Sequence, residues 1–248
     1  MLIEPTTLTR LFNLKPQGIL HVGAHEAEEY EIYENAGWLS SGKIIWVEAQ
    51  PLLAKKLELR RLPSTDRVIC AAAWHESGIN LTLNIASNSQ SSSVFEFGTH
   101  KESHPEIYFE KKHNVPAIRL DSVINEVNFD FIALDIQGAE LNALIGLGDI
   151  LKQVRWIYTE CNKVEVYKSA ATIVEIDRFL AYRGFKRVAT KWVPNVGWGD
   201  CLFINMRLVS RMEKIRIQIG QVIFVFISGL SIIRIYIRLL ARKVFNHV

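Results

Sequence analysis

The sequence contains little cysteine, and its three cysteines form no recognisable metal or redox motif. Cys70, Cys161 and Cys201 are odd in number, lie in apolar strand-like runs and include no CxxC pair. This pattern predicts buried thiols in a reducing compartment and argues against a catalytic cysteine. The first residues also lack the basic start and the long apolar segment of a secretory signal. We therefore expect the body of the chain to be cytoplasmic.

The body of the chain also lacks the basic excess that binding to nucleic acid requires. The whole chain has a formal net charge of +3. From Arg207 onward there are eight Lys or Arg residues and one acid, Glu213, so residues 207–248 carry +7 and residues 1–206 carry −4. Because phosphate binding needs a basic footprint, we expect no nucleic-acid partner. The charge of the tail instead indicates a membrane surface or another anionic partner.

A third absence concerns glycine in a turn that suggests a nucleotide site. Residues 18–27 read as a strand, a turn with the single glycine Gly23, and the start of a helix. A second apolar run, residues 44–47, ends in Glu48, where nucleotide-binding α/β folds place an acid that accepts hydrogen bonds from ribose. The turn and the acid together predict a nucleoside cofactor. The second and third glycines of a GxGxxG motif are missing, which argues against a dinucleotide-binding sheet.

Apolar runs alternate with helical patterns in the first third of the chain. Residues 1–17 form a lead-in with a short helix at 7–13. The next predicted elements are strands at 19–22, 43–48 and 67–73, with helices at 27–36 and 51–62. This alternation predicts a parallel sheet with helices on both faces.

A polar segment interrupts this alternation. Residues 81–85 alternate and predict an edge strand, but residues 86–116 show no clear period. We interpret 86–116 as an insertion over the carboxyl edge of the sheet that acts as a lid or binding segment. Its histidines, His100, His104 and His113, lack the spacing of a metal site, so we expect no metal.

The end of the body distinguishes two architectures. Further strands are predicted at 118–122, 129–136 and 155–159, followed by an amphipathic helix at 173–182. The last two strands, 185–190 and 200–204, leave no room for a helix between them and must form an antiparallel hairpin. Such a hairpin closes class I methyltransferases, whereas dinucleotide-binding sheets continue with helical crossovers. We predict an α/β class I methyltransferase (Rossmann-like) domain over residues 18–206, followed by a hydrophobic and basic helical tail over residues 207–248.

Six short blocks follow one another in a fixed order between residue 18 and residue 205. They are His-Val-Gly-Ala-His (21–25), Trp-Val-Glu-Ala-Gln-Pro (46–51), three serines (91–93), Val-Pro-Ala-Ile-Arg-Leu-Asp (115–121), Leu-Asp-Ile-Gln-Gly-Ala-Glu (134–140) and Gly-Trp-Gly-Asp (197–200). Together they resemble the FkbM-type family of S-adenosylmethionine-dependent methyltransferases. That family is similar to enzymes that methylate hydroxyl groups, often on sugars of surface polysaccharides or on natural products.

The resemblance implies S-adenosylmethionine as the cofactor and also implies its contacts. Glu48 would take the ribose hydroxyls, because a charge-assisted hydrogen bond is stronger than a neutral one. His21 stands where many relatives have an acid, near the methionine end of the cofactor. The expected contacts are His21, Gly23, Ala24, His25, Glu48, Ala49, Ala72, Ala73 and Asp135.

Methyl transfer to an alcohol also requires a group that accepts a proton. Asp135 and Glu160 follow neighbouring central strands, at the edge where ligands collect in open α/β sheets. Glu140 begins the helix after Asp135. We expect these three acids to be catalytic, with Asp135 at the junction of cofactor and acceptor. Whether Asp135 is the base, a cofactor ligand or the residue that orients Gln137 is left open by the sequence.

The tail contains a charge-free run of seventeen residues, 217–233. As a helix it would span about 25 Å, short of a hydrocarbon core of roughly 30 Å. An interfacial or re-entrant membrane anchor fits at least as well as a spanning helix. The alternative is a helix packed on the body or on a second subunit.

Taken together, the sequence predicts an O-methyltransferase that acts on a hydroxyl group of a sugar, a glycoconjugate or a natural product. The acceptor would be a small molecule or a glycan. One alternative is an NAD-dependent oxidoreductase, against which the missing glycines and the closing hairpin count. The other is a catalytically silent binding module of the same fold.

Overall fold

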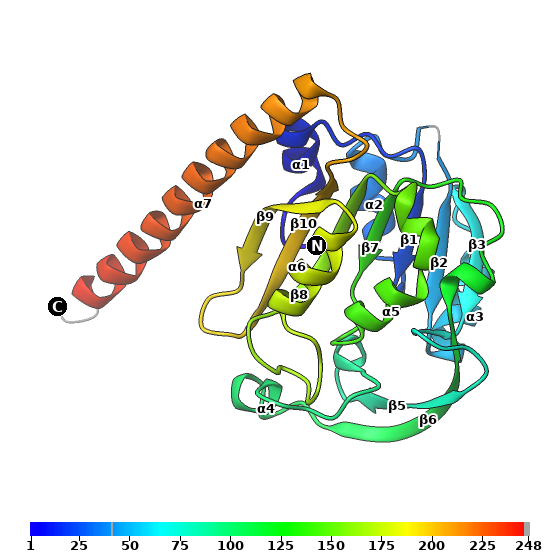
Figure 1. Ribbon diagram of the computed structural model, residues 1–248. Coiled ribbons are helices and arrows are strands. Elements are labelled where there is room, and N and C mark those ends of the chain that lie inside the picture. The colour runs from blue at the N-terminus through cyan, green and yellow to red at the C-terminus, as the bar shows by residue number, and fades with distance from the viewer. Residues whose placement is uncertain (41, 246–248) are drawn as a thin grey trace.

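A seven-stranded sheet forms the centre of the body (Figure 1). The structure, a computed structural model, describes residues 1–40 and 42–245. The strand order is β3-β2-β1-β7-β8-β10-β9. The strands are β1 (Ile19–Val22), β2 (Ile44–Glu48), β3 (Thr65–Cys70), β7 (Phe131–Leu134), β8 (Trp156–Asn162), β9 (Phe185–Trp192) and β10 (Trp198–Asn205). Neighbours from β3 to β8 are parallel, and β10 is antiparallel to β8 and to β9, which confirms the predicted α/β class with a closing hairpin.

Helices cover both faces of this sheet because its central strands are apolar on both sides. All residues of β1, β2 and β7 are buried, and successive residues of β1 enter different cores. One core joins β1 to α1 (Pro5–Phe12), α2 (Glu29–Asn35) and α3 (Pro51–Arg60). The other joins it to α5 (Glu140–Gly146), α6 (Ile173–Tyr182) and the 3₁₀ helices η2 (Leu120–Ser122) and η3 (Gly148–Lys152). In Figure 1, α5 and α6 lie in front of the sheet and α2 lies behind it.

A second, three-stranded sheet corrects the prediction for residues 81–116. It consists of β4 (Ala72–Ala73), β6 (Phe109–Ile118) and β5 (Asn80–Ala86), in that order. The predicted edge strand 81–85 therefore belongs to this sheet, and the segment 86–116 contains much of β6 besides η1 (Ser89–Ser91) and α4 (His100–Ser103). The first half of β6 is polar and largely exposed, which masked the strand in the sequence.

The cysteine prediction was also wrong. Cys161 on β8 and Cys201 on β10 form a disulfide, and Cys70 at the end of β3 is exposed. The antiparallel pairing of β8 with β10 brings the two sulfur atoms together. The cysteines therefore no longer argue for a reducing compartment, and the cytoplasmic location stays a prediction.

The tail forms one helix, α7 (Arg211–Phe245), which begins against the body and extends away from it (Figure 1). Ile217 and Phe224 are buried in the core that contains α1. Residues 246–248 of the predicted tail lie outside the described residues. Among the residues whose side chains the structure describes, 1–40 and 42–229, no helix is long and apolar enough to cross a membrane.

Candidate functional site: two adjoining pockets at the strand ends

The turn after β1 brings two strand ends into contact. Gly23 has a φ of +89°, and its amide donates to the carbonyl oxygen of Val47 at 2.9 Å. A Cβ atom at Gly23 would overlap the carbonyl oxygen of Asp135, just beyond β7. Only glycine therefore lets the turn after β1 lie directly against the loop after β7.

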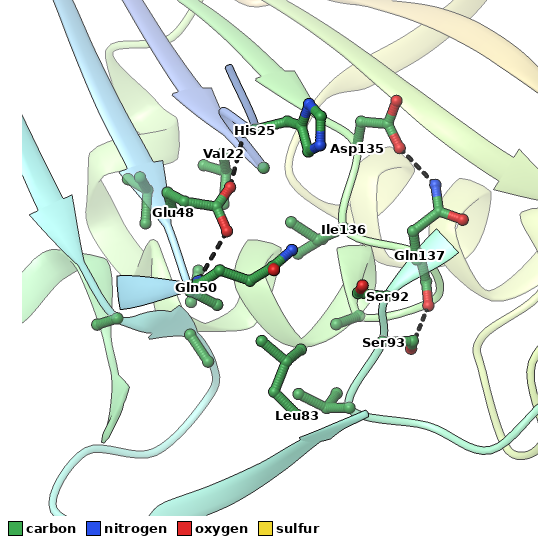
Figure 2. A pocket seen from close by; sticks show the side chains of 18 of the residues that line it. Val22, His25, Glu48, Gln50, Leu83, Ser92, Ser93, Asp135, Ile136 and Gln137 are labelled. Atoms are coloured by element: carbon green, nitrogen blue, oxygen red, sulfur yellow. Dashed lines mark hydrogen bonds between the residues drawn. The ribbon is translucent and has the colours of Figure 1, made fainter. Parts of the chain in front are cut away.

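A first pocket opens at this turn, between the ends of β1, β2 and β7 and the second sheet (Figure 2). Its empty volume is about 630 Å³, including the part that is open to solvent. Residues 71–73 and Leu83 form an apolar wall, and residues 89–94 lie across it. Of the predicted cofactor contacts, the pocket is lined by Gly23, His25, Glu48, Ala49, Ala72, Ala73 and Asp135.

Glu48 is fixed at the end of β2 with its carboxylate in the pocket wall. One oxygen accepts the amide of His25 at 2.8 Å and the other accepts the amide of Gln50 at 2.7 Å (Figure 2). The side chain is only 5% exposed, and burial raises its pKa. Each oxygen retains a lone pair, so the carboxylate is held ready to accept hydrogen bonds from neighbouring hydroxyl groups of a ligand.

Two predicted cofactor contacts lie elsewhere. His21 is 2% exposed, its Nδ1 lies 3.0 Å from the Tyr33 hydroxyl, and its ring packs on Trp46. Ala24 is fully buried in the core beneath α2. Neither residue lines either of the two pockets described here, and their contact with the cofactor stays a prediction. Side chains alternate along β1, and His21 points to the face opposite the one that Leu20 and Val22 occupy.

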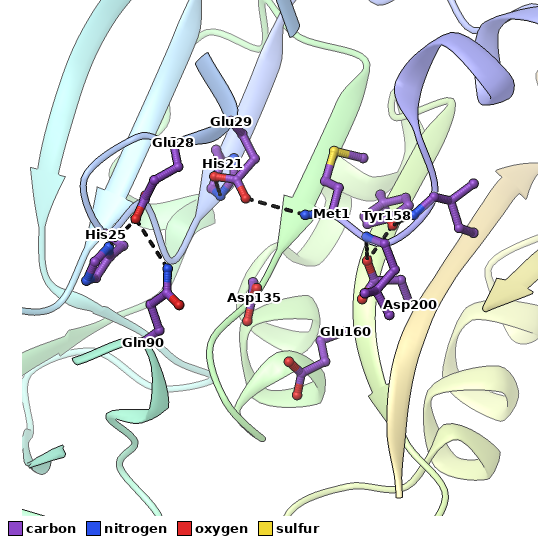
Figure 3. A network of polar contacts seen from close by, with 12 residues as sticks. Met1, His21, His25, Glu28, Glu29, Gln90, Asp135, Tyr158, Glu160 and Asp200 are labelled. Atoms are coloured by element: carbon purple, nitrogen blue, oxygen red, sulfur yellow. Dashed lines mark hydrogen bonds and ion pairs between the residues drawn. The ribbon is translucent and has the colours of Figure 1, made fainter. Parts of the chain in front are cut away.

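A second, larger pocket adjoins the first, with an empty volume of about 1340 Å³ that also includes open solvent. The two pockets share five lining residues, which are Gly23, His25, Gln90, Asp135 and Gln137. The remaining wall of the second pocket is rich in acids, as Figure 3 shows in part. Those acids are Glu28, Glu29, Glu106, Glu160 and Asp200.

The lead-in also reaches this second pocket, which the sequence did not predict. The amide of Leu2 donates to Asp200 Oδ2 at 2.6 Å, and the amide of Ile3 donates to the Tyr158 hydroxyl at 2.9 Å. The Tyr158 hydroxyl in turn donates to the same Asp200 oxygen (Figure 3). These backbone contacts fix residues 1–3 along the pocket wall. A contact between segments so far apart in the sequence leaves no local signal.

Gln137 connects the two predicted strand-end acids. Its Nε2 donates to Asp135 Oδ1 at 2.7 Å and to Glu160 Oε2 at 3.0 Å. Its Oε1 accepts the Tyr167 hydroxyl at 2.6 Å, and its backbone carbonyl accepts Ser93 Oγ at 2.7 Å. Among the described residues, Asp135 Oδ2 has no hydrogen-bond partner, so this oxygen is available where the two pockets meet.

The environments of the two acids differ. Burial, followed by the charges of Asp135 and Glu140, raises the pKa of Glu160 well above its ordinary value. Burial also raises the pKa of Asp135, but the Gln137 hydrogen bond opposes that change. The Asp135 side chain is still exposed to solvent through the pocket. We therefore infer that, of these two acids, Asp135 is the one that is ionised and Glu160 the one that holds a proton.

Glu140 lines neither of the two pockets, and its catalytic role stays a prediction. It is 1% exposed, and its Oε1 accepts the amides of Ile136 and Gly138 at 3.1 and 3.2 Å. These bonds hold the turn in which Gln137 has a φ of +53°. Burial raises the pKa of Glu140 to about 7. Glu140 therefore positions the Asp135–Gln137 turn from beneath.

This raised pKa predicts a pH-dependent stability. Between the ordinary value of 4.5 and about 7, folded Glu140 keeps a proton that the unfolded chain has lost, so stability falls as pH rises through this window. Glu140→Gln removes this loss while its amide oxygen still accepts both backbone amides. Above pH 7 we expect its free energy of unfolding to exceed that of the wild type by up to about 3 kcal/mol. Chemical denaturation across this pH range tests this, with the exposed Glu58→Gln as the control, and an unchanged pH slope in Glu140→Gln would contradict it.

His25 bridges the strand turn and the segment above it. Its Nδ1 lies 2.6 Å from Glu28 Oε1, and its Nε2 lies 2.7 Å from Ser89 Oγ. Both ring nitrogens are therefore engaged, so His25 is less suited than Asp135 to take a proton from a ligand.

His100 stacks on Phe97 with the ring centroids 4.4 Å apart, and it lines the second pocket. No group of three or more histidine, cysteine or acidic side chains that could hold a metal occurs in the described part of the chain.

A family model matches more than half of the chain. Residues 21–187 match the family model described as the methyltransferase FkbM domain. The chain belongs to the FkbM methyltransferase family. The match lies within the predicted domain 18–206, confirms the resemblance seen in the sequence and supports S-adenosylmethionine as the cofactor. No curated protein matches the chain.

Three solved structures are similar to the chain at low sequence identity. Methyltransferase FkbM from Methylobacillus flagellatus is 14% identical with a TM-score of 0.49, and the comparison covers 75% of this chain and 43% of that one. Magnesium protoporphyrin IX methyltransferase from Synechocystis, with bound SAM, is 7% identical with a TM-score of 0.42, covering 75% and 69%. The plantazolicin methyltransferase BpumL, in complex with SAH, is 13% identical with a TM-score of 0.45, covering 82% of each chain. The chain thus spans less than half the length of the Methylobacillus protein.

Proposed function

We propose that this FkbM-family chain is an S-adenosylmethionine-dependent O-methyltransferase that acts on a neutral, hydroxyl-rich acceptor. The observation that carries the proposal is the junction of the two pockets. The first pocket has the features of a nucleoside site, the second is large enough for a small molecule or a sugar, and Asp135 Oδ2 is available between them. A methyl donor and an acceptor in these pockets would meet beside this carboxylate.

The residues of the first pocket fit S-adenosylmethionine. Glu48 presents carboxylate oxygens suited to vicinal ribose hydroxyls, and Gly23 leaves space that a Cβ atom would fill. Ala72 and Ala73 add a small apolar surface for a base. When bound, S-adenosylmethionine supplies an electrophilic methyl group on a sulfonium.

The groups of the chain itself then account for proton transfer. Asp135 Oδ2 accepts the proton of the acceptor hydroxyl, while the Gln137 amide holds Oδ1 and fixes the orientation of the carboxylate. Protonated Glu160 faces the same space and can donate a hydrogen bond to the acceptor. Tyr167 and Ser93 hold Gln137 in place, so the pair of acids is oriented before an acceptor binds.

The acidic wall of the second pocket indicates the class of acceptor. Carboxylates accept hydrogen bonds from sugar hydroxyls but repel phosphate groups. This supports a sugar, a glycoconjugate or a hydroxylated natural product over a nucleic acid, in agreement with the charge of −4 on residues 1–206. The experiment is to incubate the full chain with methyl-labelled S-adenosylmethionine and separate sets of neutral glycans, hydroxylated small molecules and RNA. We expect label in methyl ethers of neutral acceptors, and label found only in RNA or on nitrogen would contradict the proposal.

The role of Glu48 can be tested without knowing the acceptor. Glu48→Ala removes the acceptor of the ribose hydrogen bonds, so its Kd for S-adenosylmethionine should rise about 10- to 100-fold, as expected for bonds to a charged group. Calorimetry with adenosine and dideoxyadenosine provides the matched control, because the second ligand lacks both ribose hydroxyls. We expect Glu48→Ala to weaken the binding of adenosine and to leave the binding of dideoxyadenosine unchanged. Equal weakening of both ligands would show that Glu48 acts only on the shape of the pocket.

A further inference from the structure

The amphipathic half of α7 carries an apolar stripe that faces away from the body. Its members are Met212, Ile215, Ile219, Val222 and Phe226, each between 45% and 74% exposed. Their spacing of three and four residues places them on one face of the helix. We refer to these five residues as the outer stripe.

The opposite face of the same helix is already occupied. Ile217 and Phe224 are buried in the core that contains α1, and a Cβ atom at Gly220 would overlap Leu11 and the Phe12 ring. Each of these three positions lies two residues from a member of the outer stripe, which is about 200° around a helix of 3.6 residues per turn. When one face of α7 packs on the body, the outer stripe on the opposite face is therefore exposed.

Polar contacts hold α7 in this rotation. Arg155 Nη2 lies 2.6 Å from Glu213 Oε1, and the Ser210 amide donates to Glu213 Oε2 at 2.7 Å. Lys186 Nζ donates to Gln221 Oε1 at 3.3 Å further along the helix. The stripe is thus presented outward by a helix that the body anchors on its other side.

The charge around the stripe identifies what it fits. Residues 207–248 carry +7, whereas residues 1–206 carry −4. Arg211, Lys214 and Arg216 flank the start of the stripe, and the sequence of the same helix continues with Arg234 and Arg238. An apolar stripe bordered by basic residues is the pattern of a helix that lies in the interface of an anionic bilayer.

We propose that the outer stripe of α7 docks the protein on an anionic lipid surface, with the helix lying in the plane of the interface. A second copy of the chain would share the net positive charge of α7, so electrostatic repulsion disfavours pairing of two such helices along the stripe. In Figure 1, α7 begins at the end of the molecule opposite β5, whose Leu83 lines the first pocket. The surface is therefore separate from the proposed methyl-transfer site, and the two proposals stand or fall independently.

The experiment is co-sedimentation of the full chain with vesicles. Phosphatidylcholine vesicles with about one third phosphatidylglycerol are compared with vesicles of phosphatidylcholine alone. The test variant combines Ile219→Gln, Val222→Gln and Phe226→Gln. The matched control combines Leu52→Gln, Leu59→Gln and Val174→Gln, which changes equally exposed apolar residues on α3 and α6.

We expect the wild type and the control variant to bind the anionic vesicles, and the stripe variant to bind them at least about tenfold more weakly. Added salt should weaken the wild-type binding. Circular dichroism establishes that both variants keep the helix content of the wild type. No binding to anionic vesicles, or equal binding of the stripe variant, would overturn the proposal. The proposal would also be overturned if light scattering showed that the wild type and the control variant are dimers and the stripe variant is a monomer. The stripe would then belong to an interface between copies of the chain.

Discussion

Replacing Asp135 with asparagine should lower the kcat of methyl transfer by about 100- to 10,000-fold, the range expected when a general base is removed. The side-chain oxygen of the introduced asparagine can still accept the Gln137 amide, so the pockets and the Kd for S-adenosylmethionine should change little. Initial rates with labelled cofactor and calorimetry on the same samples separate the two quantities. The wild-type kcat should rise with pH as Asp135 loses its proton, and Asp135→Asn should lose this rise, because asparagine does not titrate.

Glu160→Gln is the matched comparison, because the same amide holds Glu160. Burial raises the pKa of Glu160 well above its ordinary value, which favours the protonated form that glutamine imitates. We expect a loss of kcat of no more than about tenfold. A larger loss in Glu160→Gln than in Asp135→Asn would assign the proton acceptor to Glu160 and contradict the proposed roles.

Replacing Gly23 with alanine should abolish cofactor binding and destabilise the fold by about 4 kcal/mol or more. A φ of +89° alone costs an alanine about 1–2 kcal/mol. The new Cβ would also overlap the Asp135 carbonyl, so the turn after β1 and the loop after β7 must separate. Separation would open the first pocket at the point where Gly23 lines it. Denaturant unfolding and calorimetry with S-adenosylmethionine measure the two effects.

Gly37→Ala isolates the cost of the backbone conformation. Gly37 has a φ of +73°, but a Cβ atom there would meet no heavy atom within 4 Å. We therefore expect a loss of only about 1–2 kcal/mol and an unchanged affinity for the cofactor. If Gly23→Ala behaves like Gly37→Ala, the contact between the two strand ends does not shape the pocket.

The sequence predicted the main sheet because its strands are bounded by local signals. The turn at Gly23 and the acid Glu48 directly follow buried apolar runs, and Asp135 and Glu160 follow such runs on neighbouring strands. Parallel pairing then brings all of these residues to one edge of the sheet. The bounds of α6 are those predicted, since a capping box at Thr172 starts the helix.

The sequence could not show which face each side chain would occupy. Glu140 begins α5 as expected, but the turn before it folds back so that the carboxylate accepts backbone amides instead of facing the pocket. His21 alternates away from the pocket into the core beneath α2. In β6, pairing with β5 overrides a charged sequence that alone indicates a loop.

Long-range contacts were equally hidden. The bonds of Gln137 come from residues that lie as far away as Ser93 and Tyr167, and no local pattern joins them. The disulfide between Cys161 and Cys201 likewise depends on the pairing of β8 with β10. Such contacts follow from the register of the sheet rather than from spacing along the chain.

The most direct test of the account is calorimetric titration of the full chain with S-adenosylmethionine, S-adenosylhomocysteine and NAD(H) in parallel. The account predicts micromolar binding of the first two ligands, weakened in Glu48→Ala, and no binding of NAD(H). Binding of NAD(H) alone would contradict it and favour an oxidoreductase. Binding of none of the three would contradict it as well, and would indicate a silent module of the same fold.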